Sequence, residues 1–221
     1  MIIQDNLSRQ KLSIAIPVDI ERLARNYLGL KLRYMKLSDS GRILGLTSYK
    51  GVNMVLPFTG GDVFLSVPED TIMLDESLLE NDTRTRFTVA HECAHQIIAR
   101  LEERQTGMSF RKVFMPGATY SWHELKTAER WSEWQANTLG AALLIPRGEL
   151  AWAWHALSAP QTISLLDGRF SPLAYALVKQ LAIKFAVSIG AMTVRLKKLG
   201  FVTEFSKVLP QRLSLAVGVA G

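Results

Sequence analysis

The sequence predicts an α+β fold in which short strands come first and longer helices follow. Between residues 31 and 74, apolar residues occur in short runs separated by Gly, Asp, Ser and Pro, which is typical of strands joined by turns. After residue 83, apolar residues recur at helical intervals instead. The chain has 221 residues, of which 48% are hydrophobic, so it can bury a substantial core.

The N-terminal part should contain one short helix followed by several strands. The helix is predicted from about residue 18 to 28, where Gly29 can end it. The strands are predicted at 31–37, 43–48, 52–56, 63–67 and 71–74. They should form a small antiparallel or mixed sheet that packs on the next helix.

That next helix is predicted over residues 83–101. Asn81, Asp82 and Thr83 are typical helix-starting residues, and apolar residues follow them at helical intervals. The helix contains the segment FTVAHECAHQIIA at residues 87–99. An ordinary amphipathic helix would also show this periodicity, so the polar residues inside the segment decide its interpretation.

His91, Glu92 and His95 have the spacing H-E-x-x-H inside this helix. Residues four apart on a helix differ by about 40° around its axis, so the two imidazoles should point the same way and could hold one zinc ion. Glu92 would lie beside them as a general base. The pattern therefore predicts a metal site with a carboxylate next to it.

A third metal ligand is expected from a second helix, predicted over residues 121–146, because a catalytic zinc ion usually has three protein ligands. Ser121 and Glu124 have the spacing of a capping box, and Pro146 can stop the helix. Positions four apart form one stripe on which an inward-facing ligand would lie. The residues on this stripe are Glu129, Glu133, Asn137 and Ala141.

Glu133 is the predicted third ligand, with Glu129 and His123 as alternatives. A histidine that binds a metal normally donates its other ring N–H to an oxygen acceptor, which fixes the tautomer of the ring. Asn137 lies one turn after Glu133 and could supply that oxygen. A solvated surface charge remains the ordinary alternative for any one of these glutamates.

These two helices resemble those of the ImmA/IrrE-type metallopeptidases. The resemblance rests on the segments RFTVAHECAHQII and EWQANTLGAALLIP and extends weakly over residues 17 to 202. It implies a zincin-like domain in which His91, His95 and Glu133 bind zinc and Glu92 is catalytic. Related proteins cut helix-turn-helix transcriptional repressors, so the resemblance also implies a repressor of stress or mobile-element genes as the substrate.

Two positions depart from the pattern of that family. Cys93 stands where the family more often has a small or aliphatic residue, and Leu139-Gly140 stands where Phe-Ala is commoner. Cys93 lies about 200° around the helix from His91, so we expect a buried thiol that faces away from the metal. Neither departure affects a predicted ligand.

The predicted mechanism is hydrolysis of a peptide bond, in which Glu92 accepts a proton from the attacking water and returns it to the leaving amine. A second donor to the oxyanion is expected. The spacing does not select among the candidates for that role, which are His123, Tyr120, His155, Tyr175 and Arg195. In zincin-like folds an edge strand can also pair with an extended substrate, but the sequence does not identify that strand.

We interpret residues 1–150 as the zincin-like core and residues 151–221 as a helical extension, together forming one compact unit. The extension resembles a helix-turn-helix, because Ser171-Pro172 can start one helix and Ser188 can cap another that Gly200 ends. The early positions of the second helix offer little hydrogen-bonding capacity to DNA bases, which favours a packing role.

Two other functions stay open: a DNA- or protein-binding module that uses this segment beside a structural metal, and a metal-bound regulator that blocks a partner without cleaving it. The intact Glu92 argues against the second of these. The net charge of +6 is compatible with DNA, and equally with an acidic surface on a protein partner. The five Trp residues are expected to pack in the core or the cleft.

Residues 102–120 form a connection that is long enough to be functional, and we hypothesise that it lines the cleft and selects substrate, with an ordinary solvated loop as the alternative. The chain shows no signal-peptide pattern and no apolar stretch of about 18 residues. Its one cysteine excludes an internal disulfide framework. We therefore expect a cytoplasmic protein in a minimal, single-domain form.

Overall fold

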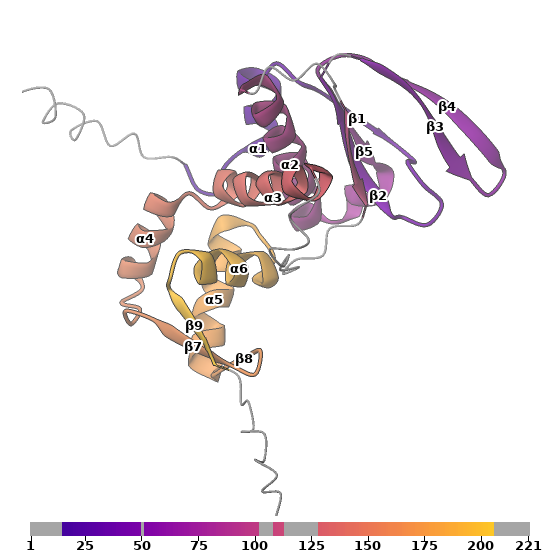
Figure 1. The fold of residues 1–221 in the computed structure, drawn as a ribbon. Helices are drawn as coiled ribbons and strands as arrows, with labels where there is room; N and C mark the ends of the chain where they lie inside the picture. Colours follow the sequence, from indigo (N-terminus) through magenta and orange to yellow (C-terminus); the bar gives the residue numbers. More distant parts are fainter. Residues whose placement is uncertain (1–14, 50, 102–107, 113–127, 206–221) are drawn as a thin grey trace, which may run out of the picture.

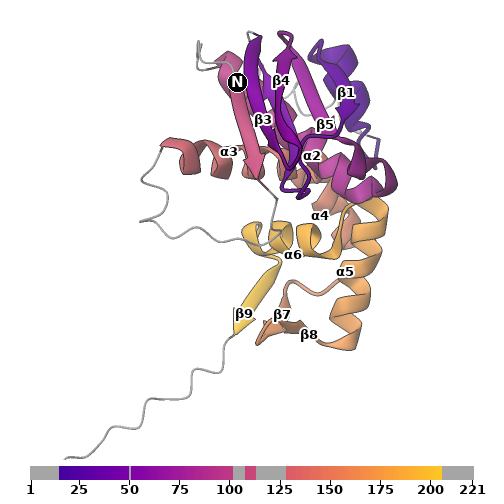
Figure 2. The same cartoon turned by 90° about the vertical axis from the view of Figure 1, so that its right-hand side faces the viewer.

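The computed structural model describes residues 15–49, 51–101, 108–112 and 128–205 (Figure 1). It confirms the predicted α+β class, with a mixed main sheet, smaller sheets and helices among the described residues. The main sheet and the C-terminal helices lie on opposite sides of one long helix, α3 (Ala128–Leu144), in both views of the ribbon (Figures 1 and 2). This helix therefore connects the two halves of the molecule.

The N-terminal helix is shorter and less regular than the sequence predicts. It begins as α1 (Ile20–Arg22), where the side chain of Asp19 accepts a hydrogen bond from the backbone N–H of Arg22 at 2.9 Å. It continues as a π-helical segment, η1 (Leu23–Tyr27). Gly29 then has a φ of 70°, the left-handed conformation that favours glycine after a helix.

All five predicted strands are present, and a sixth joins them. The main sheet has the order β1 (Lys31–Met35), β5 (Thr71–Asp75), β2 (Ile43–Ser48) and β6 (Met108–Lys112). The sheet is mixed, because β1 runs parallel to β5 while β2 runs antiparallel to both β5 and β6. The other two strands, β3 (Val52–Phe58) and β4 (Gly61–Val67), form a separate antiparallel hairpin.

Two helices that follow the sheet lie against each other. A short 3-10 helix, η2 (Glu76–Glu80), leads into α2 (Asp82–Leu101), which packs against β2 and against α3. The side chain of Asn81 accepts a hydrogen bond from the backbone N–H of Arg84 at 3.1 Å, so the predicted start of this helix is confirmed. The described part of α3 begins at residue 128, and the predicted first turns at 121–127 lie outside the described residues.

The C-terminal part contains the two predicted helices and a small sheet that the sequence analysis did not predict. After α4 (Arg147–Ala156), the sheet has the order β8 (Arg169–Phe170), β7 (Ile163–Leu166) and β9 (Val202–Phe205). The helices α5 (Pro172–Phe185) and α6 (Ile189–Lys198) are bent by 103° at the break between them. Ser171 and Ser188 cap these two helices, as predicted.

The larger hydrophobic cluster contains side chains from residue 20 to residue 202, so the sheet, α2 and the C-terminal helices share buried neighbours. A smaller cluster lies between the main sheet and the β3–β4 hairpin, and consists of Leu37, Leu46, Leu56, Val67 and Met73. In the part of the chain that the structure describes, no single helix is long and apolar enough to cross a membrane, and only the bent pair of α5 and α6 reaches that length together.

Candidate metal centre

One polar stripe of α2 faces strand β2. Thr88, Glu92 and Gln96 lie four residues apart, so they share one side of the helix. A Cβ atom built on Gly45 of β2 would lie 2.7 Å from Thr88 Cγ2 and 3.0 Å from Glu92 Oε1. Gln96 donates from Nε2 to Thr47 Oγ1 at 2.6 Å. Glu92 is completely buried, and Gly45 leaves the space that its carboxylate occupies.

A second polar stripe of α2, one residue before the first and so about 100° away around the helix axis, faces α3. His91 and His95 lie on this stripe, with 3.0 Å between their Nε2 atoms. The carboxylate of Glu133 on α3 contacts both rings, at 3.3 Å from His91 Nε2 and 3.1 Å from His95 Nε2. The structure therefore brings together the three residues for which the sequence predicts metal binding.

The separations between these atoms suit a common metal ion. All three ligand atoms of His91, His95 and Glu133 lie within 4.8 Å of one another. Two ligand atoms bound to one tetrahedral zinc ion are roughly 3.3 Å apart, given bonds of about 2.0–2.1 Å. Two imidazoles and one carboxylate also match the donor types that zinc takes in catalytic sites and leave a fourth position open.

Asn137 determines the tautomer of the first histidine. Its Oδ1 atom lies 3.1 Å from His91 Nδ1, and an amide oxygen can only accept a hydrogen bond. The proton of the His91 ring therefore lies on Nδ1, which leaves the lone pair of Nε2 pointing toward His95 and Glu133. This is the arrangement in which an imidazole binds a metal through Nε2.

The carboxylate of Glu133 stays ionised although it is largely shielded from water. Burial raises its pKa, but its contacts with the rings of His91 and His95 lower it by more, so the pKa lies well below its usual range. The Glu133 side chain remains 22% exposed, whereas that of His91 is 0% exposed. The centre is therefore closed on the α2 side and open beside α3.

Gly140 allows the two helices to approach closely at the histidines. A Cβ atom at Gly140 would lie 3.1 Å from the backbone nitrogen of His91 and 3.2 Å from the carbonyl carbon and oxygen of Ala90. Both Gly140 and Gly45 contribute to the centre, and the sequence analysis assigned neither of them a role. An isolated glycine inside a strand pattern, as at Gly45, is a signal of close approach that could have identified it.

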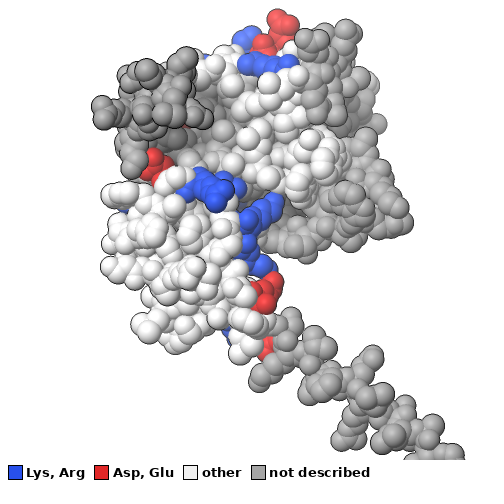
Figure 3. Space-filling model, turned by 60° about the vertical axis from the view of Figure 1, so that its left-hand side comes forward, with Lys and Arg blue, Asp and Glu red and all other residues white. Residues whose placement is uncertain are grey.

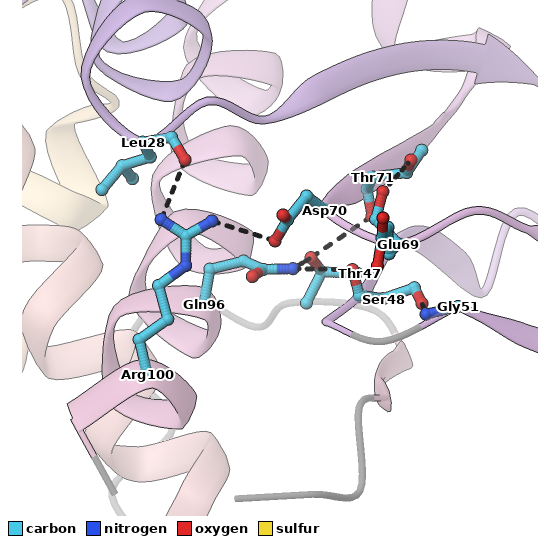
Figure 4. A network of polar contacts seen from close by, with 9 residues as sticks. All are labelled: Leu28, Thr47, Ser48, Gly51, Glu69, Asp70, Thr71, Gln96 and Arg100. Carbon is cyan, nitrogen blue, oxygen red and sulfur yellow. Dashed lines mark hydrogen bonds and ion pairs between the residues drawn. The ribbon is translucent and has the colours of Figure 1, made fainter. Parts of the chain in front are cut away.

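Polar contacts at the C-terminal half of α2 hold this helix against the sheet (Figure 4). Gln96 Nε2 donates to Thr47 Oγ1 and, at 2.9 Å, to the carbonyl oxygen of Ser48. One turn later, Arg100 forms an ion pair with Asp70 at 2.9 Å. Because Gln96 directly follows the second histidine, these contacts fix the helical turn that carries it.

The other predicted site residues lie elsewhere or outside the described residues. His123 and Tyr120, the first candidates for the oxyanion donor, fall in residues 113–127, which the structure does not describe. His155 is exposed on α4 and Tyr175 is exposed on α5. Arg195 is buried on α6 and donates to the carbonyl oxygen of Ile145 at 3.0 Å. The role of oxyanion donor therefore stays unassigned.

Cys93 is fully buried and is not among the three ligands. Burial and the nearby charge of Glu92 raise the pKa of its thiol to about 12. The side chain therefore stays a neutral thiol at physiological pH, in agreement with the expected packing role.

The contacts of the helix-turn-helix-like segment favour packing. Lys198, near the end of α6, donates from Nζ to Thr138 Oγ1 on α3 at 2.9 Å. Ala191 and Met192, at the start of α6, are buried in the core. A DNA-reading helix needs these early positions exposed in order to contact base edges.

A family model described as Peptidase_M78, IrrE N-terminal-like domain, matches residues 59–197, which is more than half of the chain. The matched segment extends from the β3–β4 hairpin to α6 and includes the three possible metal ligands. The comparison with curated proteins found no match. The resemblance to ImmA/IrrE-type proteins is thereby confirmed.

Proposed function

We propose that this chain, which belongs to the Peptidase_M78 family of IrrE N-terminal-like domains, is a zinc-dependent endopeptidase that acts at the centre between α2 and α3. Membership of this family implies a metallopeptidase-type function. The observation that carries the proposal is the convergence of His91, His95 and Glu133, whose ligand atoms lie within 4.8 Å of one another, beside the buried Glu92.

The ligands of this centre would act as follows. His91 and His95 would hold the metal through Nε2, and Glu133 would hold it through its carboxylate. Asn137 would keep the proton of His91 on Nδ1. A bound zinc ion supplies a Lewis acid, which lowers the pKa of water and stabilises negative charge on a carbonyl oxygen.

Glu92 is the proposed general base. It accepts a proton from a water molecule as the water oxygen bonds to the carbonyl carbon of a peptide, and it then donates that proton to the amide nitrogen when the C–N bond breaks. Both of its carboxylate oxygens are shielded from solvent. Between α2 and Gly45 the carboxylate has little room to turn, so its orientation is set before substrate binds.

The substrate backbone is proposed to pair with β6. This strand lies at one edge of the main sheet, next to β2, and Arg111 of β6 is paired with Gly45 of β2. Gly45 in turn contacts Glu92, so β6 is the edge nearer to the proposed base. An extended peptide can add to such an edge through backbone hydrogen bonds, with little dependence on its sequence.

The proposed natural substrate is a helix-turn-helix transcriptional repressor, whose cleavage would relieve repression of stress or mobile-element genes. The support for this is the resemblance to ImmA/IrrE-type proteins at the two ligand helices. The net charge of +6 would assist encounter with an acidic protein surface. Because such repressors act on DNA, the proposed place of action is the cytoplasm.

The test compares the wild-type protein with Glu92→Gln. Both proteins are purified, their zinc content is measured by mass spectrometry, and each is incubated with repressors encoded beside its gene. We expect about one zinc ion per chain in both proteins, and cleavage by the wild type alone. Cleavage by Glu92→Gln at the wild-type rate would refute the role of Glu92, and absence of both zinc and cleavage would refute the proposed function.

A further inference from the structure

Three cationic side chains gather along the flank of α3, and we call them the basic group: Arg147, Arg195 and Lys198. Burial lowers the pKa of Arg195, and the charge of Arg147 lowers it further. Burial also lowers the pKa of Lys198, and Arg195 adds to that effect. Arg195 therefore lies close enough to Arg147 and to Lys198 for like charges to repel. Figure 3 shows Lys and Arg side chains gathered beside a hollow in the middle of this face.

None of the three has a carboxylate partner among the described residues. The hydrogen bonds that the structure gives to Arg195 and Lys198 are to neutral oxygens, the carbonyl of Ile145 and the hydroxyl of Thr138. Other cations of the described chain have ion pairs, such as Lys197 with Glu204 and Arg100 with Asp70. Arg195 and Lys198 are partly desolvated, and the described residues supply no counter-charge, so the group creates a positive potential to which an anion is the complement.

The basic group adjoins the metal centre through α3. Lys198 binds Thr138, which follows Asn137 in the sequence, and its Nζ lies 5.5 Å from the ring centroid of Trp134, which follows Glu133. Consecutive residues on a helix differ by about 100° in direction, so these contacts lie on the flank of α3 next to the face that carries Glu133. An extended peptide bound at the open side of Glu133 could therefore reach the basic group.

Aromatic side chains lie beside the charges on this flank. The rings of Trp131 and Trp134 are stacked, with centroids 4.9 Å apart and planes inclined by 19°. Trp131 is 37% exposed, which leaves part of the pair open to a ligand. Such a pair offers a rigid apolar surface for the backbone or side chains of a peptide.

We propose that the basic group binds an acidic segment of the protein substrate, so that the centre selects for Asp or Glu near the cleaved bond. This inference rests on the proposed function, because it assigns the group to that substrate. A peptide fits better than a nucleic acid, because Ala191 and Met192 near the start of α6 are buried, and because Lys198 contacts Thr138 on α3, the helix that carries Glu133.

The test measures binding separately from cleavage. In the Glu92→Gln background, fluorescence anisotropy measures the affinity for a labelled hexaglutamate peptide, a hexalysine peptide and a DNA duplex. The variant Arg147→Gln/Lys198→Gln removes two charges of the basic group, and both residues are exposed, so their replacement should be tolerated. The matched control is Lys197→Gln, which removes the neighbouring charge that is paired with Glu204.

We expect the double variant to weaken hexaglutamate binding by about tenfold or more and the Lys197 control to change it by less than about twofold. In a second arm, the wild type should cut an Asp- or Glu-flanked peptide faster than its Asn- or Gln-flanked counterpart, and the double variant should lose that preference. Equal hexaglutamate binding in all variants would overturn the inference. Tighter binding of the DNA duplex than of hexaglutamate, lost only in the double variant, would also overturn it.

Failure of the inference can be distinguished from failure of the proposed function. Cleavage without any preference for acidic residues, together with unchanged peptide binding in the double variant, refutes the inference and leaves the endopeptidase intact. If hexaglutamate binds through the basic group while no protein or peptide is cut, the proposed function fails, and with it the assignment of this group to a substrate.

Discussion

The two helices of the metal centre are held in different ways. All residues of α2 from Phe87 to Gln96 are buried, and the helix contacts β2 on one side and α3 on the other. From Trp131 to Leu143, only two residues of α3 are buried, Ala136 and Gly140. The two histidines therefore come from a helix fixed by packing, while the carboxylate ligand comes from the more open helix. On the proposed function, the difference favours approach of a substrate from the α3 side.

Removal of a histidine from the buried helix should have the largest effect. His91→Ala removes one of three ligands and the ring that Asn137 orients, so we expect loss of stoichiometric zinc and of detectable cleavage. His155→Ala is the matched control, because this histidine is exposed on α4. Zinc analysis and cleavage assays check both variants, and retention of full zinc binding by His91→Ala would contradict the site.

Disruption of the contact between α2 and α3 should have the second largest effect. Gly140→Val places a branched side chain where a Cβ alone would lie 3.1 Å from the backbone of His91, so α3 must move away and carry Glu133 with it. We expect zinc affinity to fall by at least about a hundredfold, since ligand geometry is lost. Gly148→Val is the control, because nothing lies within 4 Å of its Cβ position. Competition with a zinc chelator measures the affinities.

Disruption of the contact between α2 and β2 should lower turnover and leave metal binding unchanged. Gly45→Ala brings a methyl group to 3.0 Å from Glu92 Oε1, which displaces the proposed base while the ligands stay in place. A displacement of about 1 Å can lower the rate by about a hundredfold. We expect kcat to fall by that amount with zinc content unchanged. An equal loss of zinc would show that the two sides of α2 are not independent.

The hydrogen bond across the two helices should have a smaller effect. Asn137→Ala removes the acceptor at 3.1 Å from His91 Nδ1, so the ring can turn or change tautomer. Loss of such a partner typically lowers metal affinity or activity by about 10–100-fold. Thr138→Ala, at the next position on the same helix, should keep zinc affinity unchanged. Titration with zinc and cleavage rates compare the two variants.

Loss of the hydrogen bonds between Gln96 and β2 should change stability more than catalysis. Gln96→Leu removes two buried hydrogen bonds to β2 and leaves the oxygens of Thr47 and Ser48 with one donor fewer. We expect the free energy of unfolding to fall by about 1–3 kcal/mol. Activity per folded molecule should stay within about twofold of the wild type. Denaturant unfolding measures the stability, and a loss of activity without a loss of stability would contradict this role.

Much of the fold could be predicted because helices, strands and their caps are encoded locally. The five strands before α2, and the capping of its first turn by Asn81, were predicted from short patterns. Strand β6 was not, because it forms only by pairing with β2, more than 50 residues away in the chain. The hairpin of β7 and β8 did have a local sequence signal, because Asp-Gly is a typical pair for a two-residue hairpin turn. Asp167 and Gly168 indeed both have positive φ.

The spacing of His91, Glu92 and His95 determines by itself that two imidazoles share one face of a helix and that a carboxylate lies beside them, because helical periodicity depends only on neighbouring backbone hydrogen bonds. Only the tertiary structure decides that Glu133 meets those imidazoles, that Gly45 makes room for Glu92 and that Lys198 lies beside Trp134. Such contacts join distant segments, and their geometry follows from how the whole core packs.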